Sequence, residues 1–225
     1  KNKIRATWGY PIDVYLQEAT YFYPVLDRLK QIPQPIIAYG VEIGNGGMSY
    51  IHQMADTYPG KTILLGDWSG FDHTIPAWII RDAFSIIAEG IDFSHFVDSS
   101  GTVQYVRASR SKRRWKRTIQ YFIDTPVRLS NGERYMKHCG VPSGSCWTNV
   151  IDSIVNCLVM RYCVFELSGS FPLADIYLGD DSVVILPKPI CLDTFSAFAF
   201  EQFGMKFNSD KSSQVRDTSL IHFLG

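Results

Sequence analysis

The chain has 225 residues, of which 46% are apolar and 20% charged, and its 22 basic residues balance 22 acidic ones. This composition is ordinary for a globular protein, and the length suits one large domain or two small ones. No run of about 18 uninterrupted apolar residues occurs, so we expect no membrane span. The cysteines show no C-x-x-C spacing, which indicates reduced thiols in an intracellular setting.

Charge is distributed unevenly along this neutral chain. Seven of the eleven residues in 107–117 are Arg or Lys, whereas acidic residues gather around Asp67, Asp72, Asp180 and Asp181. The distribution is therefore a better guide to partners than the total, which gives no sign of nucleic acid.

The first quarter of the chain predicts two helices and a strand. Residues 12–30 place apolar side chains at helical spacing, and Pro33 and Pro35 end that helix. Residues 35–60 contain a glycine-rich stretch and predict a loop followed by a short helix. Residues 61–65 predict a buried strand.

The middle of the chain predicts a helix and a hairpin. Pro76 opens a helix that runs to about Ala88. Residues 118–127 and 133–138 are expected to pair as strands around Asn131-Gly132, a dipeptide that favours hairpin turns.

The last third predicts a long helix over residues 148–166, two short strands at 176–178 and 182–186, and a helix over 190–203. The two strands flank a tight turn. The whole order of elements predicts an α+β fold, with an antiparallel sheet and helices packed on one face.

Two adjacent carboxylates, Asp180 and Asp181, follow Gly179 in that turn. They repel each other, and a divalent cation would relieve the repulsion because Mg²⁺ and Mn²⁺ prefer hard oxygen ligands. The alternative is a solvated Asp-Asp turn, and the tripeptide alone does not decide between them.

Asp67 directly follows a predicted buried strand, where a carboxylate is well placed to bind metal. Asp72, five residues later, would reach another part of the same ligand. The alternative is a strand that ends in a turn, with Asp72 or Thr74 capping the helix that Pro76 begins.

The stretch Ser143-Gly144-Ser145 has small side chains, which let a backbone bend tightly and approach a sugar or phosphate. Thr148 and Asp152 follow one helical turn apart and share a face of the next helix. The alternative is an ordinary loop and helix start.

These elements follow one another as Asp-x4-Asp, Ser-Gly-x3-Thr-x3-Asp and Gly-Asp-Asp. In order and spacing they resemble motifs A, B and C of the viral RNA-directed RNA polymerases. Lys3-Ile4-Arg5 is similar to motif F, Phe203-Gly204-Met205 with Asp210-Lys211-Ser212 to motif D, and His222-Phe223-Leu224-Gly225 to the start of motif E. Trp8-Gly9-Tyr10-Pro11 and the wording around motifs A and B resemble the partitivirus-like enzymes of double-stranded RNA viruses. Asp152 departs from the picornavirus pattern, which commonly has Asn there.

The resemblance implies a right-hand polymerase palm with part of the fingers and without the thumb, so we expect a partial sequence of a longer protein. The implied division is a fingers segment with motif F at 1–60, palm with motif A at 61–90, a fingers insertion at 91–139, palm with motifs B, C and D at 140–213, and the start of motif E at the thumb junction at 214–225.

The resemblance also implies the reaction, which is nucleotidyl transfer from an NTP to an RNA 3′-hydroxyl on an RNA template with two Mg²⁺ or Mn²⁺ ions. Asp67 and Asp180 are the implied bridging metal ligands, with Asp181 as a weaker ligand and the Gly66 carbonyl as a further oxygen. Lys211 is the implied general acid toward pyrophosphate. Lys206 is its rival.

For the nucleotide, the resemblance implies that Asp72 binds the ribose 2′-hydroxyl and so favours NTP over dNTP, whereas reverse transcriptases have an aromatic side chain there. Lys3 and Arg5 are the implied contacts of the triphosphate. The full implied substrate-binding set is Lys3, Arg5, Asp72, Ser143, Gly144, Thr148 and Asp152.

The basic run lies between motifs A and B, where this family inserts fingers structure. With Trp115 among its cations, it is typical of a contact to the template backbone. A solvated basic loop is the alternative. The predicted RNA-binding residues are Arg107, Arg110, Lys112, Arg113, Arg114, Lys116 and Arg117.

The implied partners are template and nascent RNA, NTPs and the viral capsid protein, with no membrane, and the implied location is the virion interior or the host cytoplasm. Two other functions stay open at this point. One is a reverse transcriptase, against which Asp72 argues, and the other is a catalytically incomplete RNA-binding fragment.

Overall fold

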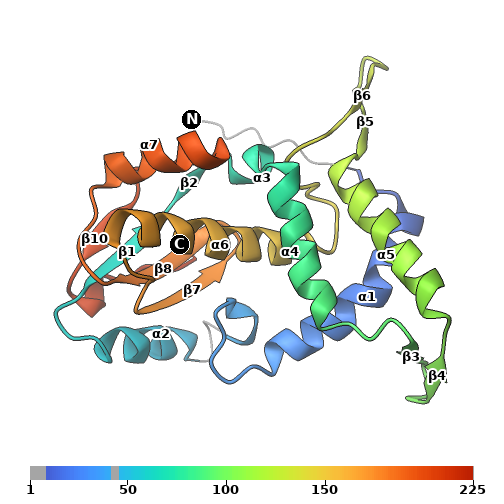
Figure 1. The fold of residues 1–225 in the computed structure, drawn as a ribbon, viewed down its shortest axis with the longest axis horizontal. Helices are drawn as coiled ribbons and strands as arrows, with labels where there is room; N and C mark the ends of the chain where they lie inside the picture. The colour runs from blue at the N-terminus through green and yellow to red at the C-terminus, as the bar shows by residue number, and fades with distance from the viewer. Residues whose placement is uncertain (1–8, 42–45, 225) are drawn as a thin grey trace.

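The computed structural model describes residues 9–41 and 46–224. Its centre is a four-stranded sheet in the order β10-β1-β8-β7, in which every neighbouring pair is antiparallel (Figure 1). The strands are β1 (Thr62–Gly66), β7 (Ala174–Leu178), β8 (Asp181–Leu186) and β10 (Ser213–Val215). The predicted strands at 61–65, 176–178 and 182–186 are confirmed.

Helices cover both faces of this sheet. Helices α6 (Thr148–Ser168) and α7 (Leu192–Phe203) lie on one face, as expected, and α2 (Gly47–Asp56) lies on the other (Figure 1). Alternating strand residues supply the two cores: Leu64 and Val184 belong to the cluster under α6, and Ile63 to the cluster under α2. The prediction of helices on one face was therefore incomplete. Because β8 is buried from its second residue to its last, it needs cover on both sides.

The remaining helices lie beside the sheet and form the second half of the molecule (Figure 1). They are α1 (Ile12–Lys30), α4 (Ala77–Glu89) and α5 (Ala108–Ile123). Trp147, at the start of α6, ties them to the sheet, because its ring contacts Phe22 of α1, Phe84 of α4 and Trp115 of α5 at centroid distances of 5.2, 5.7 and 5.4 Å.

The predicted strand over residues 118–127 was wrong for most of its length. Residues 118–123 are the last turns of α5, and only Pro126–Arg128 (β5) pairs with Arg134–Met136 (β6). Apolar side chains at helical spacing decide the outcome, since Trp115, Thr118 and Phe122 are all buried on one face of the helix. The predicted turn at Asn131-Gly132 is confirmed, and its hairpin projects from the body (Figure 1).

Short elements complete the described chain: η1 (Ala38–Gly40), α3 (Phe71–Thr74), the pair β2 (Trp68–Ser69) and β9 (Lys206–Phe207), the pair β3 (His95–Val97) and β4 (Val103–Tyr105), and η3 (Thr218–Leu220). Over residues 9–41 and 46–224, no helix has both the length and the apolar character needed to cross a membrane.

Candidate active site

Strand register brings three acidic residues to one end of the sheet. Gly66 of β1 lies opposite Ser182 of β8, so Asp67, one residue further, lies beside Asp181. Asp180 occupies the turn between β7 and β8. Burial raises the pKa of Asp181, and the nearby charges of Asp180 and Asp67 raise it further.

Glycine at position 66 permits this close approach of β1 to its neighbours. A Cβ there would lie 2.6 Å from Ser182 Oγ and 3.2 Å from the Phe207 ring, which is too close for an undistorted contact. The metal-binding role of the Gly66 carbonyl stays a prediction.

Residues 208–212, which follow α7, contact both the main chain and the carboxylate of Asp67. The Asp67 N–H donates to Ser212 Oγ at 2.9 Å, and the Asn208 N–H donates to the Asp67 carbonyl at 2.9 Å. Asn208 Nδ2 also donates to Asp67 Oδ2 at 3.1 Å, and Lys211 Nζ lies 3.9 Å from the same oxygen. Sequence reasoning missed Asn208. The orientation of the Asp67 carboxylate is therefore fixed by motif D.

Helix α6 holds the turn that carries Asp180. Ser153 Oγ accepts from the Gly179 N–H at 2.8 Å, and Asn156 Nδ2 donates to the carbonyls of Gly179 and Asp181 at 3.1 and 3.3 Å. Asn156 Oδ1 accepts from the Trp68 indole N–H at 2.9 Å, so one buried amide joins motifs A, B and C. Sequence reasoning missed both α6 residues, although polar side chains on a buried helix face were the available signal.

Asp72 lies in α3, and its main chain is bound by the segment that leads into motif B. The Val141 N–H donates to the Asp72 carbonyl at 2.7 Å, and the Gly140 N–H donates to the Ile75 carbonyl at 2.7 Å. Gly140 has a φ of 70°, and a Cβ there would lie 2.4 Å from the Asp72 carbonyl oxygen. Gly140 and Val141, which lead into motif B, therefore hold the main chain around Asp72.

The capping alternative for Asp72 was wrong. Helix α4 begins after Pro76 without a side-chain cap, and Thr74 Oγ1 bonds back to the carbonyls of Gly70 and Phe71. Asp72 is partly exposed and does not serve the helix start.

Asp67, Asp180 and Asp181 together form the acidic centre of the site. Asp152 of α6 is a buried carboxylate close to Asp180 of this centre and to Asp72. It is 4% exposed, and its Oδ1 has no hydrogen-bond partner among the described residues. Burial raises its pKa well above the usual value, and the charges of Asp72 and Asp180 add to the rise. The structure thus brings Asp152 into the same electrostatic neighbourhood as both motif A and motif C.

The predicted nucleotide loop precedes α6. Ser143 is exposed and Gly144 is partly exposed, whereas Ser145 is buried. Thr148 Oγ1 donates to the Pro142 carbonyl at 2.6 Å, so this hydroxyl closes the loop on itself. The substrate contacts of Ser143, Gly144 and Thr148 stay predictions.

The predicted cationic residues divide into three groups. Lys3 and Arg5 lie outside the described residues. The side chain of Lys211 is 69% exposed and next to Asp67, whereas Lys206 lies on β9 opposite Ser69. Lys211 is therefore the lysine that the structure places at the acidic centre.

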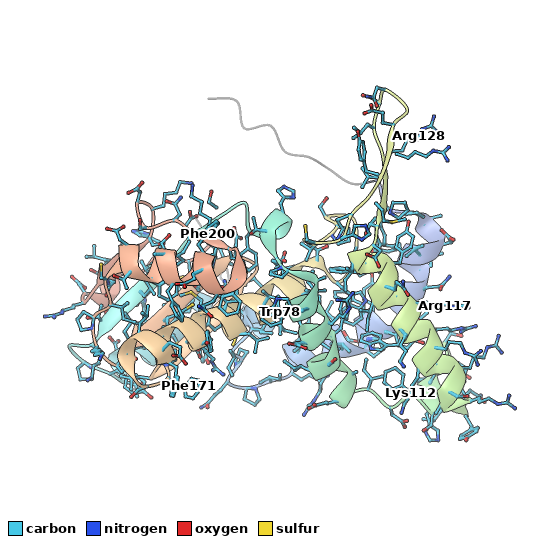
Figure 2. The ribbon with its side chains drawn as sticks, turned by 45° about the horizontal axis from the view of Figure 1, so that its top comes forward. Trp78, Lys112, Arg117, Arg128, Phe171 and Phe200 are labelled. Atoms are coloured by element: carbon cyan, nitrogen blue, oxygen red, sulfur yellow. The ribbon has the colours of Figure 1, made fainter. Side chains whose placement is uncertain are left out.

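The basic run forms the exposed face of α5, not a loop. Its seven Arg and Lys side chains are all exposed, and Lys112 and Arg117 point outward from the helix in Figure 2. Trp115 is only 5% exposed and packs in the core against Phe84. Trp115 therefore does not lie among the exposed cations, as the sequence suggested, because helical spacing turns it inward.

The acidic centre has the donor chemistry of a divalent-cation site, since carboxylate oxygens are the ligands that Mg²⁺ and Mn²⁺ prefer. The repulsion among Asp67, Asp180 and Asp181 is also what a cation offsets. Within the described part of the chain, however, no three His, Cys, Asp or Glu side chains gather closely enough to form a ready metal site. The donor types fit the ions, and the ligand set stays a prediction.

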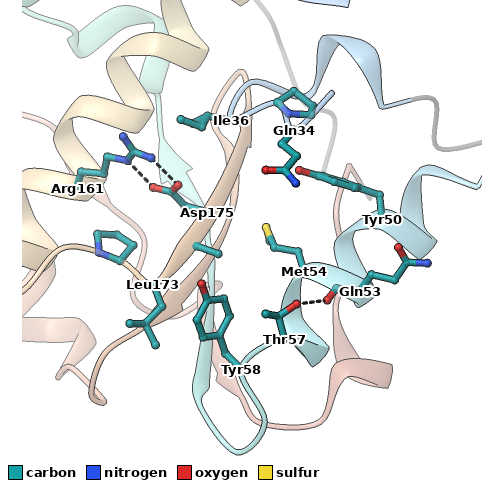
Figure 3. A pocket seen from close by; sticks show the side chains of 13 residues that line it. Gln34, Ile36, Tyr50, Gln53, Met54, Thr57, Tyr58, Arg161, Leu173 and Asp175 are labelled. Atoms are coloured by element: carbon teal, nitrogen blue, oxygen red, sulfur yellow. Dashed lines mark hydrogen bonds and ion pairs between the residues drawn. The ribbon is translucent and has the colours of Figure 1, made fainter. Parts of the chain in front are cut away.

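A cavity of about 460 Å³ lies elsewhere, between α2 and the beginning of β7 (Figure 3). On its wall, Arg161 Nε and a terminal guanidinium nitrogen donate to the Asp175 carboxylate at 2.6 and 2.8 Å. Behind the wall, the buried Tyr177 Oη donates to the same carboxylate at 2.9 Å. Asp175 lies near the end of β7 that is remote from Gly179. These groups satisfy one another and are separate from the acidic centre.

The comparisons with known proteins agree with this geometry. The sequence profile of the family described as "Viral RNA-dependent RNA polymerase" matches residues 1–225. The RNA-directed RNA polymerase of Cryptosporidium parvum virus 1 is 27% identical over 94% of this chain and 38% of the relative. That of Atkinsonella hypoxylon virus is 26% identical over 99% of this chain and 39% of the relative, and that of White clover cryptic virus 1 is 26% identical over 88% and 34%.

Solved structures share the fold. The insertion-loop deletion mutant of a human picorbirnavirus RNA-dependent RNA polymerase superposes with a TM-score of 0.76 at 19% identity, covering 99% of this chain and 40% of that one. A further structure of this polymerase gives a TM-score of 0.72 over 95% and 37%. The chain therefore spans about two fifths of its solved neighbours, and a similar or smaller share of the curated relatives. Because the family profile matches from end to end, as the order of motifs predicted, this chain belongs to the viral RNA-dependent RNA polymerase family.

Proposed function

We propose that the protein containing this chain is a nucleotidyltransferase that copies an RNA template into RNA for viral replication and transcription. The observation that carries the proposal is the gathering of Asp67, Asp180 and Asp181 at one sheet end, beside Asp72 and Asp152. The similar curated proteins are named RNA-directed RNA polymerases, and the chain spans 38% of the first of them. Activity is therefore assigned to the longer protein.

Two Mg²⁺ or Mn²⁺ ions bound at this centre would neutralise phosphate charge and lower the pKa of the attacking RNA 3′-hydroxyl. Asp67 and Asp180 are the proposed principal ligands, with Asp181 as the weaker one and the Gly66 carbonyl as a further oxygen. Asn208 and Ser212 hold the Asp67 strand end in place, and Asn156 holds the Asp180 turn. The protein thus supplies preorganised oxygen donors.

Nucleotide selection is assigned to the groups around Asp72. The Asp72 carboxylate accepts a hydrogen bond from the ribose 2′-hydroxyl, which favours NTP over dNTP. Ser143, Gly144, Thr148 and Asp152 complete this side of the pocket. The charges of Asp72 and Asp180 contribute to the raised pKa of Asp152, which supports its place beside them.

The cations are assigned to phosphate groups. Lys3 and Arg5 bind the triphosphate, and Lys211, which lies beside Asp67, gives a proton to the departing pyrophosphate. The exposed cations of α5 bind the RNA backbone, because a one-sided cationic helix matches a polyanion.

We also propose the assignment of palm to residues 61–90 and 140–213, of fingers to 1–60 and 91–139, and of the thumb junction to 214–225. Template RNA, nascent RNA and NTPs are the proposed partners, with the viral capsid protein in addition. The proposed location is the virion interior or the host cytoplasm.

The test is primer extension on an RNA template by the full-length protein, comparing the wild type with Asp180→Ala. We expect extension to fall by at least about 10³-fold, because removing a metal ligand removes transition-state charge stabilisation. Asp82→Ala, which removes an exposed carboxylate from α4, is the matched control and should extend normally. Extension that survives Asp180→Ala would contradict the proposal.

An RNA-binding role without polymerisation is the second candidate for the isolated chain, because α5 is cationic while the chain spans only part of its relatives. RNA binding by residues 1–225 without extension, beside an active full-length protein, would assign that role to the chain alone.

A further inference from the structure

Glu18 of α1 is a fully buried carboxylate outside the acidic centre, with an exposed fraction of 0%. Burying a carboxylate is costly unless its oxygens accept hydrogen bonds. Burial raises the pKa of Glu18, and three donors oppose that rise. Such a residue needs an explanation that packing alone does not give.

The three donors come from two separate places. Tyr10 Oη donates to Glu18 Oε1 at 2.5 Å. On the other oxygen, Oε2, Ser145 Oγ donates at 2.6 Å and the Cys146 N–H at 3.2 Å. Oε2 therefore accepts hydrogen bonds from residues 145 and 146, which join the loop containing Ser143 and Gly144 to α6. Oε1 accepts from Tyr10, which precedes α1 in the chain.

The contact is part of a larger packing surface formed by one face of α1. Tyr15, Glu18 and Phe22 are three and four residues apart and share this face. The Tyr15 carbonyl accepts from Cys146 Sγ at 3.9 Å, and the Phe22 ring packs edge-on against Trp147 at 5.2 Å. Three successive residues, 145–147, thus rest on α1.

The segment held in this way is directly attached to the loop that carries Ser143 and Gly144. Ser145 Oγ, while donating to Glu18, accepts from the Trp147 N–H at 3.1 Å. The Ser145 carbonyl and the Pro142 carbonyl both accept from Thr148 Oγ1, at 3.2 and 2.6 Å. A shift at Ser145 would therefore move both ends of the loop.

We propose that Glu18 is a positioning residue that sets the conformation of the Pro142–Ser145 loop and so tunes nucleotide binding and sugar selection. This inference rests on the proposed polymerase function. Glu18 acts through Ser145 and Cys146 and does not touch the nucleotide.

The test compares Glu18→Met with Glu18→Gln in the full-length protein. Met matches the size of Glu and leaves Ser145 and Cys146 without an acceptor. Gln keeps one carbonyl oxygen for those two donors, and its NH₂ group can donate to the Tyr10 hydroxyl, which also accepts. Asp27→Asn neutralises an exposed acid on α1 and serves as the control.

We expect Glu18→Met to raise the KM for NTP about tenfold, to change kcat less than about twofold, and to lower the preference for NTP over dNTP. Glu18→Gln and Asp27→Asn should stay near the wild type. Hydrogen exchange at the Cys146 and Trp147 amides should become faster in Glu18→Met alone. Ser145→Ala should add little to Glu18→Met, because both remove the same bond.

Faster exchange at 146–147 with unchanged KM and sugar preference would overturn the proposal and leave Glu18 a purely structural residue. Unchanged exchange would overturn it as well. If Glu18→Met does not fold, Ser145→Ala in the wild-type background gives the same decision, with a raised KM in support and an unchanged KM against. Failure of the polymerase function itself is distinguishable, because the wild type and Asp180→Ala would then extend primers equally poorly.

Discussion

At the scale of single residues, aspartates of identical chemistry acquire different properties from their surroundings. Asp180 is exposed in a turn, while Asp67 is oriented by Asn208. Asp152 is buried, its pKa is raised, and its Oδ1 has no hydrogen-bond partner within residues 9–41 and 46–224. The structure therefore gives each of these aspartates a different burial and a different set of contacts.

Asp72→Phe should reduce discrimination against dNTP by about tenfold or more, because an aromatic side chain cannot accept the hydrogen bond of a ribose 2′-hydroxyl. The measurement is the ratio of kcat/KM for NTP and dNTP in the full-length protein. His73→Phe adds the same ring at the neighbouring exposed position and serves as the control. An unchanged ratio in Asp72→Phe would remove Asp72 from sugar selection.

At the scale of elements, helix α5 and the β5–β6 hairpin are joined to motif B by one lysine. Lys137 Nζ donates to the Phe122 carbonyl near the end of α5 at 2.9 Å and to the Gly140 carbonyl at 2.6 Å. Burial lowers the pKa of Lys137 to about 8. Because Gly140 is bound to Ile75, this lysine connects the hairpin to the segment that positions Asp72.

As the pH rises from about 8 to about 10.5, the free energy of unfolding of the wild type should increase relative to that of Lys137→Met. In this window the unfolded chain keeps the proton on Lys137 and the folded protein releases it, so unfolding takes up a proton and becomes less favourable as the pH rises. Urea unfolding of both proteins at several pH values measures the difference, in which other titrating groups cancel. A difference that is flat between pH 8 and 10.5 would show that the Lys137 pKa is not lowered.

At the scale of the whole molecule, a neutral chain separates its charges into an acidic sheet end and a cationic helix face. Lys112 and Arg117 point outward from the cationic helix (Figure 2). The tasks we propose for the two regions differ, because carboxylates attract metal ions and a cationic face attracts a phosphate backbone. The larger of the two cores, to which Trp147 belongs, packs the helical half against one face of the sheet.

Charge reversal on α5 should weaken RNA binding in a salt-dependent manner. We expect Lys112→Glu with Arg117→Glu to lower RNA affinity at low salt and to reduce the slope of log K against log salt by about 0.7 for each lost phosphate contact. Arg81→Glu, an exposed reversal on α4, is the control. Equal RNA affinity and equal salt slope in the double variant and the wild type would show that the cations of α5 are solvated and do not bind RNA.

The sequence by itself determined the family, through the order and spacing of its acidic motifs, and most elements with a clear period, such as α1, α6 and the β7–β8 hairpin. Local periodicity is short-range information, and these elements depend on it. Residues 118–123 were predicted incorrectly, because their β-prone side chains hid a helical spacing that Trp115, Thr118 and Phe122 share on the buried face of α5.

Only the tertiary structure decided which side chains support the site. The bonds from Glu18 to Ser145, from Trp68 to Asn156 and from Asp67 to Asn208 join residues 127, 88 and 141 positions apart. No local pattern encodes such pairs. They form because a buried polar group needs a hydrogen-bond partner, and only the folded chain brings that partner within reach. These bonds hold the segments that carry the aspartates in fixed positions.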